Sequence, residues 1–393
     1  ARSISGPFIW NLLMDVLLQR LEPHCAVSAY ADDLFLFVDG NSRADLERKG
    51  EQLMGIVGAW GSEVGVSVST SKTAIMLLKG SLSQQRRPTV RFAGTSLPYV
   101  IKCRYLGILV GERLSFLPHI SALRDRLSGV VAGLARVLRV DWGLSSRAKR
   151  TIYRGLMMPC ALFGASVWYK AVRRGKSLKL LTSCQRTILS GCLPVCRTVS
   201  TVALQVLAGA PPMDLDAHRS ALKFKLRKEI PLDTNDWLHG LDMTGMNWKD
   251  KMALLDERLL NEWQLRWDNA ITGHVTREFF PEAAFVYKRK DFVFTLKAGF
   301  LLTGHGSLNA FLHGRTLSTT TACSCGEEDE SWLHVLYECR LYNELRDLDA
   351  LGIVQDQGRW IVAGVVETPE RMRLLGVFAD AAFSRRRTDA ADG

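Results

Sequence analysis

The sequence predicts an α+β fold, in which a domain of mixed helices and short strands precedes a mostly helical region and a small C-terminal module. Three observations support this prediction. A β-rich run at Val27–Val38 lies between two helical patterns, residues from about 115 to 230 are helical and basic in pattern, and cysteines gather near the end of the chain. The expected domains are residues 1–110, 111–240 and 241–393, and the last contains a Cys/His module at 323–339.

The overall composition excludes several classes of protein. Hydrophobic residues make up 47% of the 393 residues and charged residues 23%, which is the balance of a globular protein rather than of a disordered or fibrous one. No apolar run approaches the roughly 20 residues needed to cross a bilayer, so we expect no membrane-spanning segment and no membrane partner.

The first expected element is a buried helix at Phe8–Leu21. Ser5 is a good N-cap, and Pro7 is tolerated in the first turn because its missing N–H would have no partner there. Apolar residues recur at helical spacing and also occupy the flanking positions, which predicts burial. Pro23 should end the helix.

The run at Val27–Val38 has two adjacent carboxylates, Asp32 and Asp33, in its middle. Because Asp is poor in strand interiors and common in turns, we expect a hairpin with this pair at or beside its tip. An amphipathic helix should follow at Asp45–Trp60. Further short strands are expected around Val64–Ser69, Ala74–Leu78, Val90–Phe92 and Tyr105–Val110.

Adjacent carboxylates at a hairpin tip repel each other unless a cation lies between them. Phosphoryl-transfer sites use such groups to hold two divalent metals about 4 Å apart, and Mg²⁺ suits a site made of oxygen ligands. Asp32 and Asp33 are therefore candidate Mg²⁺ ligands and catalytic residues. An ordinary acidic turn is the alternative interpretation.

The net charge of +11 arises in one segment, Trp142–Met213, which contains eleven basic residues and no Asp or Glu. Such a segment attracts a polyanion and releases counterions on binding. We therefore expect it to bind nucleic acid; a solvated face of a basic protein is the alternative. The candidate contacts are Arg147, Lys149, Arg150, Arg154, Arg173, Arg174, Lys176 and Lys179.

Three thiols and one imidazole make up the Cys/His module: Cys323, Cys325, His334 and Cys339. Thiolate and imidazole together favour tetrahedral Zn²⁺. His334 and Cys339 are five residues apart, about 140° around an ideal helix, so both reach one ion only if the helix is distorted or begins late. A buried Cys/His group without metal is the alternative.

The run Tyr30-Ala31-Asp32-Asp33, flanked by apolar strands, resembles the active-site hairpin of reverse transcriptases. Three further segments resemble motifs of that family in the same order: Ser3–Pro7, Gly65–Ser69 with Lys72, and Tyr105–Gly107. The resemblance implies that Lys72 protonates pyrophosphate, although a surface lysine is the alternative. The resemblance also implies that seven residues contact the substrates, namely the nucleotide, the template or the primer end. They are Ser5, Gly6, Pro7, Tyr30, Tyr105, Leu106 and Gly107.

A C-terminal Cys-Cys-His-Cys module after a reverse transcriptase resembles the non-LTR retrotransposons, and Leu302–Gly306 is similar to the C-terminal region of that family. The chain is most similar to the type-1 elements that insert into ribosomal DNA of insects, the "R-one" clade. The resemblance implies a nuclear RNA-directed DNA polymerase that copies element RNA into DNA at a nicked chromosomal target by two-metal nucleotidyl transfer. Its implied partners are an RNA template, a DNA primer or ribosomal DNA target, and dNTPs.

In this interpretation residues 1–110 are a partial polymerase palm and residues 111–240 a basic thumb or linker. Family polymerases carry a third catalytic aspartate upstream of Ser3, and the polyprotein also carries an endonuclease. Because the chain begins after that point, we expect this fragment alone not to extend a primer. Two rivals remain: a catalytically dead relic that binds RNA or DNA through its basic segment and zinc, and a metal-free C-terminal domain that only completes the polymerase fold.

Overall fold

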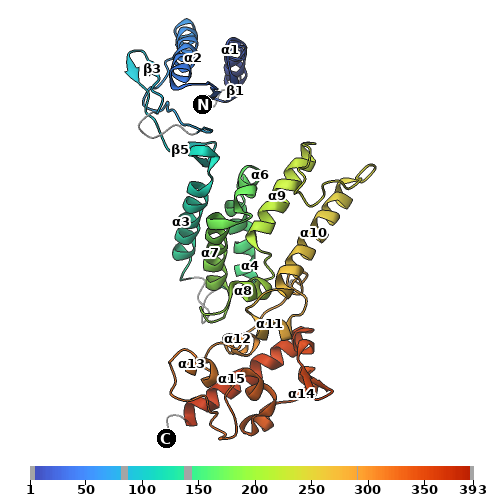
Figure 1. Ribbon diagram of the computed structural model, residues 1–393. Helices are drawn as coiled ribbons and strands as arrows, with labels where there is room; N and C mark the ends of the chain where they lie inside the picture. The colour runs from blue at the N-terminus through green and yellow to red at the C-terminus, as the bar shows by residue number, and fades with distance from the viewer. Residues whose placement is uncertain (1–4, 81–86, 137–143, 290, 390–393) are drawn as a thin grey trace. The chain divides into compact units, whose positions relative to one another are not determined.

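The computed structural model describes residues 5–80, 87–136, 144–289 and 291–389 (Figure 1). Within these ranges the chain forms helices and two-stranded antiparallel sheets, in agreement with the α+β prediction. Backbone contacts divide the chain into two compact units, Ala1–His119 and Ile120–Gly393. Each unit has a hydrophobic core of its own.

The described part of the first unit contains two long helices and three β-hairpins. Its elements are α1 (Gly6–Leu21), β1 (Ala26–Tyr30), β2 (Asp33–Phe37), α2 (Arg43–Val64), β3 (Arg91–Phe92), β4 (Thr95–Ser96), β5 (Lys102–Tyr105), β6 (Ile108–Gly111) and the short turn η2 (Glu112–Leu114). Helix α1 packs on α2, and the hairpin β1–β2 covers the same core with inward side chains such as Val27 and Leu36. The buried helix side chains are Met14, Leu17, Leu21, Leu53, Val57 and Trp60.

Helix α1 forms where it was predicted but is only partly buried. Its remaining apolar face is exposed and carries Phe8, Ile9, Leu12 and Val16. The prediction of a buried helix is therefore wrong for this face, because a periodic pattern shows that residues are apolar but not what covers them. Ser5 occupies the N-cap position, but its side chain makes no capping hydrogen bond.

Helix α2 follows the amphipathic pattern and has a cap at each end. The Ser42 side chain accepts a hydrogen bond from the N–H of Asp45, and Gly65 ends the helix at a φ of 72°. The strand predicted at Val64–Ser69 is wrong, because α2 runs to Val64 and residues 65–69 pair with no strand. The strand predicted at Ala74–Leu78 is reduced to one isolated bridge at Ile75.

The other two expected strands are parts of hairpins. Strand β3 pairs with β4, which confirms a strand near Val90–Phe92. The segment Tyr105–Val110, predicted as one strand, instead turns at Leu106 and Gly107, so that β5 and β6 pair antiparallel. Both turn residues have positive φ, 46° and 85°, which is the backbone of a tight two-residue hairpin.

The second unit is helical through most of its described length. Its elements up to residue 227 are α3 (Leu117–Gly133), which begins at the end of the first unit, α4 (Ser146–Ile152), η3 (Tyr153–Met157), α5 (Met158–Ala161), α6 (Ala165–Trp168), η4 (Tyr169–Val172), α7 (Gly175–Cys192), α8 (Thr201–Ala208) and α9 (Met213–Arg227). Helices α6 and α7 both pack on α9 (Figure 1). Pro211 and Pro212 break the helical run, because they separate α8 from α9.

The buried amide of Gln185 fixes this break from inside the unit. Its Nε2 donates to the carbonyl of Pro211 at 2.7 Å and to the Tyr153 hydroxyl at 3.1 Å. Its Oε1 accepts from the N–H of Met213 at 3.0 Å and from the Gln205 amide at 2.8 Å. Every polar atom of this amide is used by the interior, so Gln185 is a structural residue at the centre of the basic helices.

The rest of the unit wraps around a second, larger core. Its elements are α10 (Trp248–Asp268), α11 (His274–Phe279), α12 (Leu296–Thr303), α13 (Asn309–His313), η5 (His334–Glu338), η6 (Arg340–Leu345), α14 (Leu348–Leu351), β7 (Val354–Asp356), β8 (Arg359–Ile361), η7 (Ala363–Val366) and α15 (Pro369–Asp389). This core extends from Val206 through Trp263 and Trp267 to Phe383, so it crosses the boundary predicted at residue 240. No helix in the described part of the chain combines the length and apolarity needed to span a membrane.

Candidate functional site

The expected hairpin is present and has the Asp-Asp pair at its tip. Strands β1 and β2 pair antiparallel up to Tyr30 opposite Asp33, which leaves Ala31 and Asp32 as the turn. Both carboxylate residues are exposed. The predicted position of the pair is therefore confirmed.

The side chains at this tip suit a hard divalent cation but supply only part of a site. Asp32 and Asp33 offer carboxylate oxygens, which are the ligands that Mg²⁺ prefers. Among the residues that the structure describes, no third His, Cys, Asp or Glu places a ligand atom near enough to complete a group with them. The pair therefore fits an incomplete magnesium site, whose other positions water or phosphate oxygens would fill.

The hairpin β5–β6 is tied to the first hairpin by an aromatic contact. The ring of Tyr105, the last residue of β5, packs edge-on against Phe35 of β2, with centroids 5.2 Å apart. The Tyr105 hydroxyl is buried and has no hydrogen-bond partner in the described structure. The turn at Leu106 and Gly107 is thereby anchored to the strand that follows the two aspartates.

The other residues expected near substrate also belong to the first unit. Tyr30 immediately precedes the turn and is 65% exposed. Gly6 and Pro7 follow Ser5 in the sequence and begin the first turn of α1. Lys72 is exposed in the loop that follows α2, a position that leaves both interpretations of this lysine open.

The four residues of the expected zinc site converge in the second unit. The ligand atoms of Cys323, Cys325, His334 and Cys339 all lie within 4.8 Å of one another, and all four residues are buried. The Sγ atoms of Cys323 and Cys339 are 3.6 Å apart, and Cys325 Sγ is 3.3 Å from His334 Nε2. Thiolates at about 2.3 Å from a tetrahedral ion would be about 3.8 Å apart, so these residues fit a zinc ion closely.

The helix distortion predicted for His334 and Cys339 is present. Element η5 is a π-helical turn, and the N–H of Cys339 donates to the carbonyl of His334 at 2.8 Å. This five-residue step brings both side chains to one side of the turn, where an ideal α-helix would separate them by about 140°. The other two ligands lie on a tight turn, in which the N–H of Gly326 donates to the carbonyl of Cys323.

The surroundings of the cluster favour an anionic Cys325 and an oriented imidazole. Burial opposes ionisation of the Cys325 thiol, but hydrogen bonds from the Glu327 N–H, from the thiols of Cys323 and Cys339, and from the Glu328 N–H together lower the pKa of that thiol. The carboxylates of Glu328 and Glu338 lie 3.6 and 3.9 Å from Nδ1 of His334, an atom that makes no hydrogen bond in the described structure. A small approach of either carboxylate would let it orient the ring that binds a metal.

Two arginines complete the surroundings of the cluster. Arg340 donates to the carbonyl of Cys325 at 2.7 Å, and Arg346 donates to the carbonyl of Cys339. Their positive charge offsets the negative charge of a three-thiolate site. The spacing of residues in the sequence reveals the ligands of a metal but not the residues around them. These arginines and the two glutamates could therefore not be predicted from the sequence.

The eight basic residues predicted to contact nucleic acid divide into interior and surface groups. Lys149 is only 5% exposed, so the prediction that it lies on a binding face is wrong. Burial also lowers the pKa of Lys149. Arg150 donates to the backbone carbonyls of Arg289 and Phe292, at 2.9 and 3.1 Å. A count of the basic residues in a sequence does not show which of their side chains are buried.

Two more of the eight make internal contacts. Arg173 donates to the carbonyl of Asn235 at 2.7 Å, and the Arg154 guanidinium lies over the Tyr287 ring. Arg154 is nevertheless exposed, and so are the remaining four: Arg147, Arg174, Lys176 and Lys179. The surface available to a polyanion is therefore smaller than the sequence suggested.

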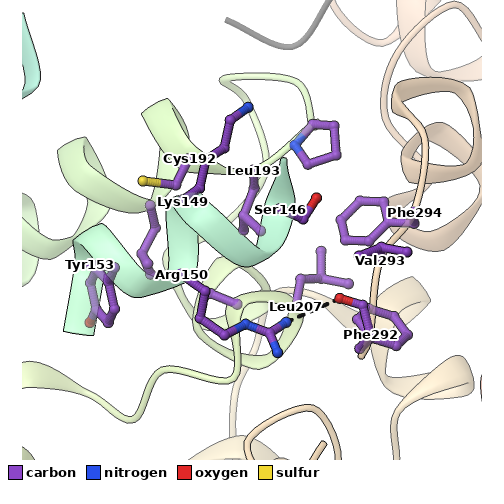
Figure 2. Close-up of a pocket in the computed structure, with 13 residues that line it drawn as sticks. Ser146, Lys149, Arg150, Tyr153, Cys192, Leu193, Leu207, Phe292, Val293 and Phe294 are labelled. Carbon is purple, nitrogen blue, oxygen red and sulfur yellow. Dashed lines mark hydrogen bonds between the residues drawn. The ribbon is translucent and has the colours of Figure 1, made fainter. Parts of the chain in front are cut away.

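A small pocket lies beside the buried lysine (Figure 2). Lys149 and Cys192 border it on one side, and Phe292 and Phe294 border it on the other. The cavity volume of about 40 Å³ holds one or two water molecules and no nucleotide. The pocket is therefore a packing gap between the basic helices and the loop before α12.

Comparison with known proteins decides the family. Residues 3–110 match the family described as reverse transcriptase (RNA-dependent DNA polymerase). The retrovirus-related Pol polyprotein from type-1 retrotransposable element R1 3 of Nasonia vitripennis is 38% identical over 371 residues, which cover 92% of this chain and 97% of that protein. The chain belongs to the Pol proteins of type-1 R1 retrotransposable elements. The resemblance inferred from the motifs is thereby confirmed.

Other R1 relatives are longer than this chain. A 115 kDa protein in type-1 retrotransposable element R1DM of Drosophila melanogaster is 58% identical over 386 residues, and the R1 Pol polyprotein of Bradysia coprophila is 42% identical over 385. Each alignment covers 98% of this chain but 38% of the relative, so the chain spans well under half of these R1 proteins. No solved structure matches the chain.

Proposed function

We propose that this R1 Pol chain carries the catalytic hairpin of an RNA-directed DNA polymerase that copies element RNA into DNA at a nicked chromosomal target. One observation carries the proposal: Asp32 and Asp33 are exposed at the tip of a tight hairpin, within the segment that matches reverse transcriptases. An acidic pair in this position serves nucleotidyl transfer.

Asp32 and Asp33 hold Mg²⁺ through their carboxylate oxygens. When bound, the metal supplies activation of the primer 3′-hydroxyl and stabilisation of the leaving pyrophosphate. Lys72 donates a proton to the pyrophosphate. Tyr30 and the start of α1, at Ser5, Gly6 and Pro7, border the nucleotide and template.

The primer end is positioned by the second hairpin. Tyr105, Leu106 and Gly107 form its turn, and the ring contact between Tyr105 and Phe35 fixes that turn relative to the acidic hairpin. Because both hairpins belong to one small unit, a primer held by one turn lies near the carboxylates of the other. A primer bound in this arrangement therefore has its 3′-hydroxyl aligned with the carboxylates.

The Cys/His cluster binds one structural Zn²⁺. Its four protein ligands, Cys323, Cys325, His334 and Cys339, leave no open position for a reacting water, so the ion stabilises rather than catalyses. The three cysteines belong to the large core of the second unit. The metal therefore holds the turn around Gly326 and the π-helical turn η5 against that core.

Nucleic acid follows the exposed cations of the second unit. Arg147, Arg174, Lys176 and Lys179 contact phosphates of the RNA template or of the ribosomal DNA target, with release of counterions. We also propose that the protein acts in the nucleus and that the zinc module assists an endonuclease located elsewhere in the polyprotein. Both rest on the family of the chain.

The test is RNA-templated primer extension by this chain joined to the upstream Pol sequence of the Drosophila melanogaster relative. We expect dNTP incorporation that Asp32→Asn abolishes and that Asp39→Asn, the same change at an exposed aspartate just beyond the hairpin, leaves intact. Because only two carboxylates meet at the hairpin tip among the described residues, we expect no incorporation by the 393-residue chain alone. Incorporation that survives Asp32→Asn would refute the proposed site.

A second candidate function is nucleic-acid binding without polymerisation. The observation in its favour is that only two carboxylates meet at the hairpin tip among the described residues. In that case the joined protein would bind RNA with normal affinity and incorporate nothing. The same extension assay, run beside an RNA-binding titration, separates the two functions.

A further inference from the structure

We propose that Trp10 is a positioning residue, which holds the turn of the β1–β2 hairpin and so fixes where Asp32 and Asp33 present their carboxylates. This inference rests on the function proposed above for the two aspartates. Trp10 lies in α1, far from them in sequence, and its indole Nε1 donates to the carbonyl of Ala31 at 2.8 Å. That carbonyl belongs to the planar peptide that joins Ala31 to Asp32, so the bond sets the orientation of the peptide leading into Asp32.

The turn needs such a restraint. Ala31 has a φ of 52°, in the left-handed region that is unfavourable for any residue with a Cβ atom, and Ala31 and Asp32 are both exposed. In the described part of the chain, no other side chain hydrogen-bonds to Ala31 or Asp32. A two-stranded hairpin is also marginally stable by itself. The indole bond is therefore a specific tie at the strained point of the turn.

The donor is itself held in place. The Trp10 ring meets the buried Trp60 ring edge-on, with centroids 6.5 Å apart and planes at 77°. Trp60 belongs to the core that also packs against Ala29 and Leu34, which form the second residue pair from the turn on β1 and β2. A rigid path thus runs from the helical core through two indoles to the peptide beside Asp32. Strained turns at functional sites persist when their surroundings restrain them in this way.

The pair of tryptophans supplies a matched control. Trp10→Phe keeps an aromatic ring and removes the N–H that reaches Ala31. Trp60→Phe makes the same chemical change at a neighbouring ring, but the Nε1 of Trp60 is buried without a hydrogen-bond partner in the described structure. Trp60→Phe should lower thermal stability through lost packing, whereas Trp10→Phe, at a half-buried ring, should lower it less.

Two measurements on the 393-residue chain test the proposal. The first is amide hydrogen exchange at Asp32, Asp33 and Leu34, which needs no metal. The second is the affinity for Mn²⁺, measured by electron paramagnetic resonance of the free ion. Binding at the hairpin tip is the Mn²⁺ binding that the double variant Asp32→Asn/Asp33→Asn loses. We expect Trp10→Phe to speed exchange and weaken Mn²⁺ binding about three- to tenfold, as loss of one hydrogen bond predicts, and Trp60→Phe to change neither by more than its effect on stability.

Each alternative result overturns the inference in a distinguishable way. Unchanged exchange in Trp10→Phe shows that the indole does not restrain the turn. Faster exchange with unchanged Mn²⁺ affinity, or equal effects of the two variants, shows a purely structural role. Absence of any Mn²⁺ binding that depends on Asp32 and Asp33 in the unmutated chain refutes the proposed metal site instead, and the positioning role falls with it.

Discussion

Tyr105 packs edge-on against Phe35, with ring centroids 5.2 Å apart and planes at 60°. The contact joins two hairpins that are separate in the hydrogen-bond pattern, since β5–β6 and β1–β2 share no ladder. Side-chain packing, and not sheet extension, therefore holds the turn at Leu106 and Gly107 close to the strand that follows the aspartates. Aromatic pairs of this geometry contribute about 1 kcal/mol beyond their buried area.

This contact predicts opposite effects for two substitutions. Tyr105→Phe keeps the ring and removes a buried hydroxyl without a partner, so we expect stability to be unchanged or higher by about 1 kcal/mol. Phe35→Ala removes the contact and should speed amide exchange throughout β5 and β6. Hydrogen exchange of these amides measures both effects. Equal loss of protection in the two variants would mean that the Tyr105 hydroxyl has a partner and that its ring is secondary.

The Cys/His cluster predicts a metal content of one zinc per chain. Cys339→Ser removes one of four ligands, and we expect it to reduce bound zinc below half an equivalent in purified protein, as measured by plasma mass spectrometry. Cys184→Ser is the control, because Cys184 is also buried but lies in α7, outside the cluster. A metal-free wild-type chain would support the rival in which this region only completes the fold.

The exposed part of the basic segment predicts a salt-dependent affinity for RNA. Arg174→Glu with Lys176→Glu should weaken binding about tenfold or more at low salt and flatten the dependence of log affinity on log salt concentration. Lys249→Glu with Arg258→Glu makes the same change in net charge on α10 and is the control. Fluorescence anisotropy with a single-stranded RNA at several salt concentrations provides the measurement. Equal losses in both double variants would indicate attraction by net charge alone.

The buried His218 predicts loss of stability in mild acid. Burial, reinforced by the Arg173 guanidinium 3.1 Å from its Nε2, lowers the pKa of His218 to about 4 and outweighs the opposing Asp236 carboxylate, which lies 3.3 Å from the same nitrogen. An unfolded histidine titrates near pH 6.5, so between these values the unfolded state binds more protons and stability falls as pH falls. The loss from His218 should reach about 2–3 kcal/mol near pH 4. Burial raises the pKa of Asp216 to about 7, and this carboxyl contributes the opposite change over the same pH range.

Urea unfolding between pH 7 and pH 4 measures this effect. His218→Gln should raise the stability at pH 4, relative to pH 7, by about 2–3 kcal/mol compared with the unmutated chain. His313→Gln, at an exposed histidine, should leave this difference unchanged. The pH dependence of the His218→Gln variant decides the matter: a slope equal to that of the wild type would place the acid-labile group elsewhere.

Local patterns predicted the parts of the fold that local chemistry determines. Two adjacent aspartates between apolar runs can hardly lie within a strand, so the hairpin tip at Asp32 could be predicted. The five-residue step between His334 and Cys339 likewise required a helix that is distorted or begins late, and η5 is a distorted one. Both predictions follow from the geometry of a few neighbouring residues.

Burial and long-range packing could not be predicted in the same way. The apolar residues of α1 suggested a buried helix, but the pattern contains no information on what covers Phe8 or Leu12, which are exposed. Lys149 resembles any other cation in the sequence, yet it is buried in a helical core. The tie between Trp10 and Ala31 joins residues 21 positions apart through a side chain and a backbone carbonyl, and neither residue type signals it.

The core that connects Val206 to Phe383 also sets the order in which the protein becomes stable during synthesis. Once residue 119 has emerged from the ribosome, the core residues described here for the first unit have all been translated. The second unit lacks Leu375, Phe378 and Phe383 until α15 has been translated. A premature stop codon before α15 would therefore release a folded acidic hairpin joined to a helical unit with an incomplete core. The apolar surface exposed in that unit would favour aggregation and proteolysis.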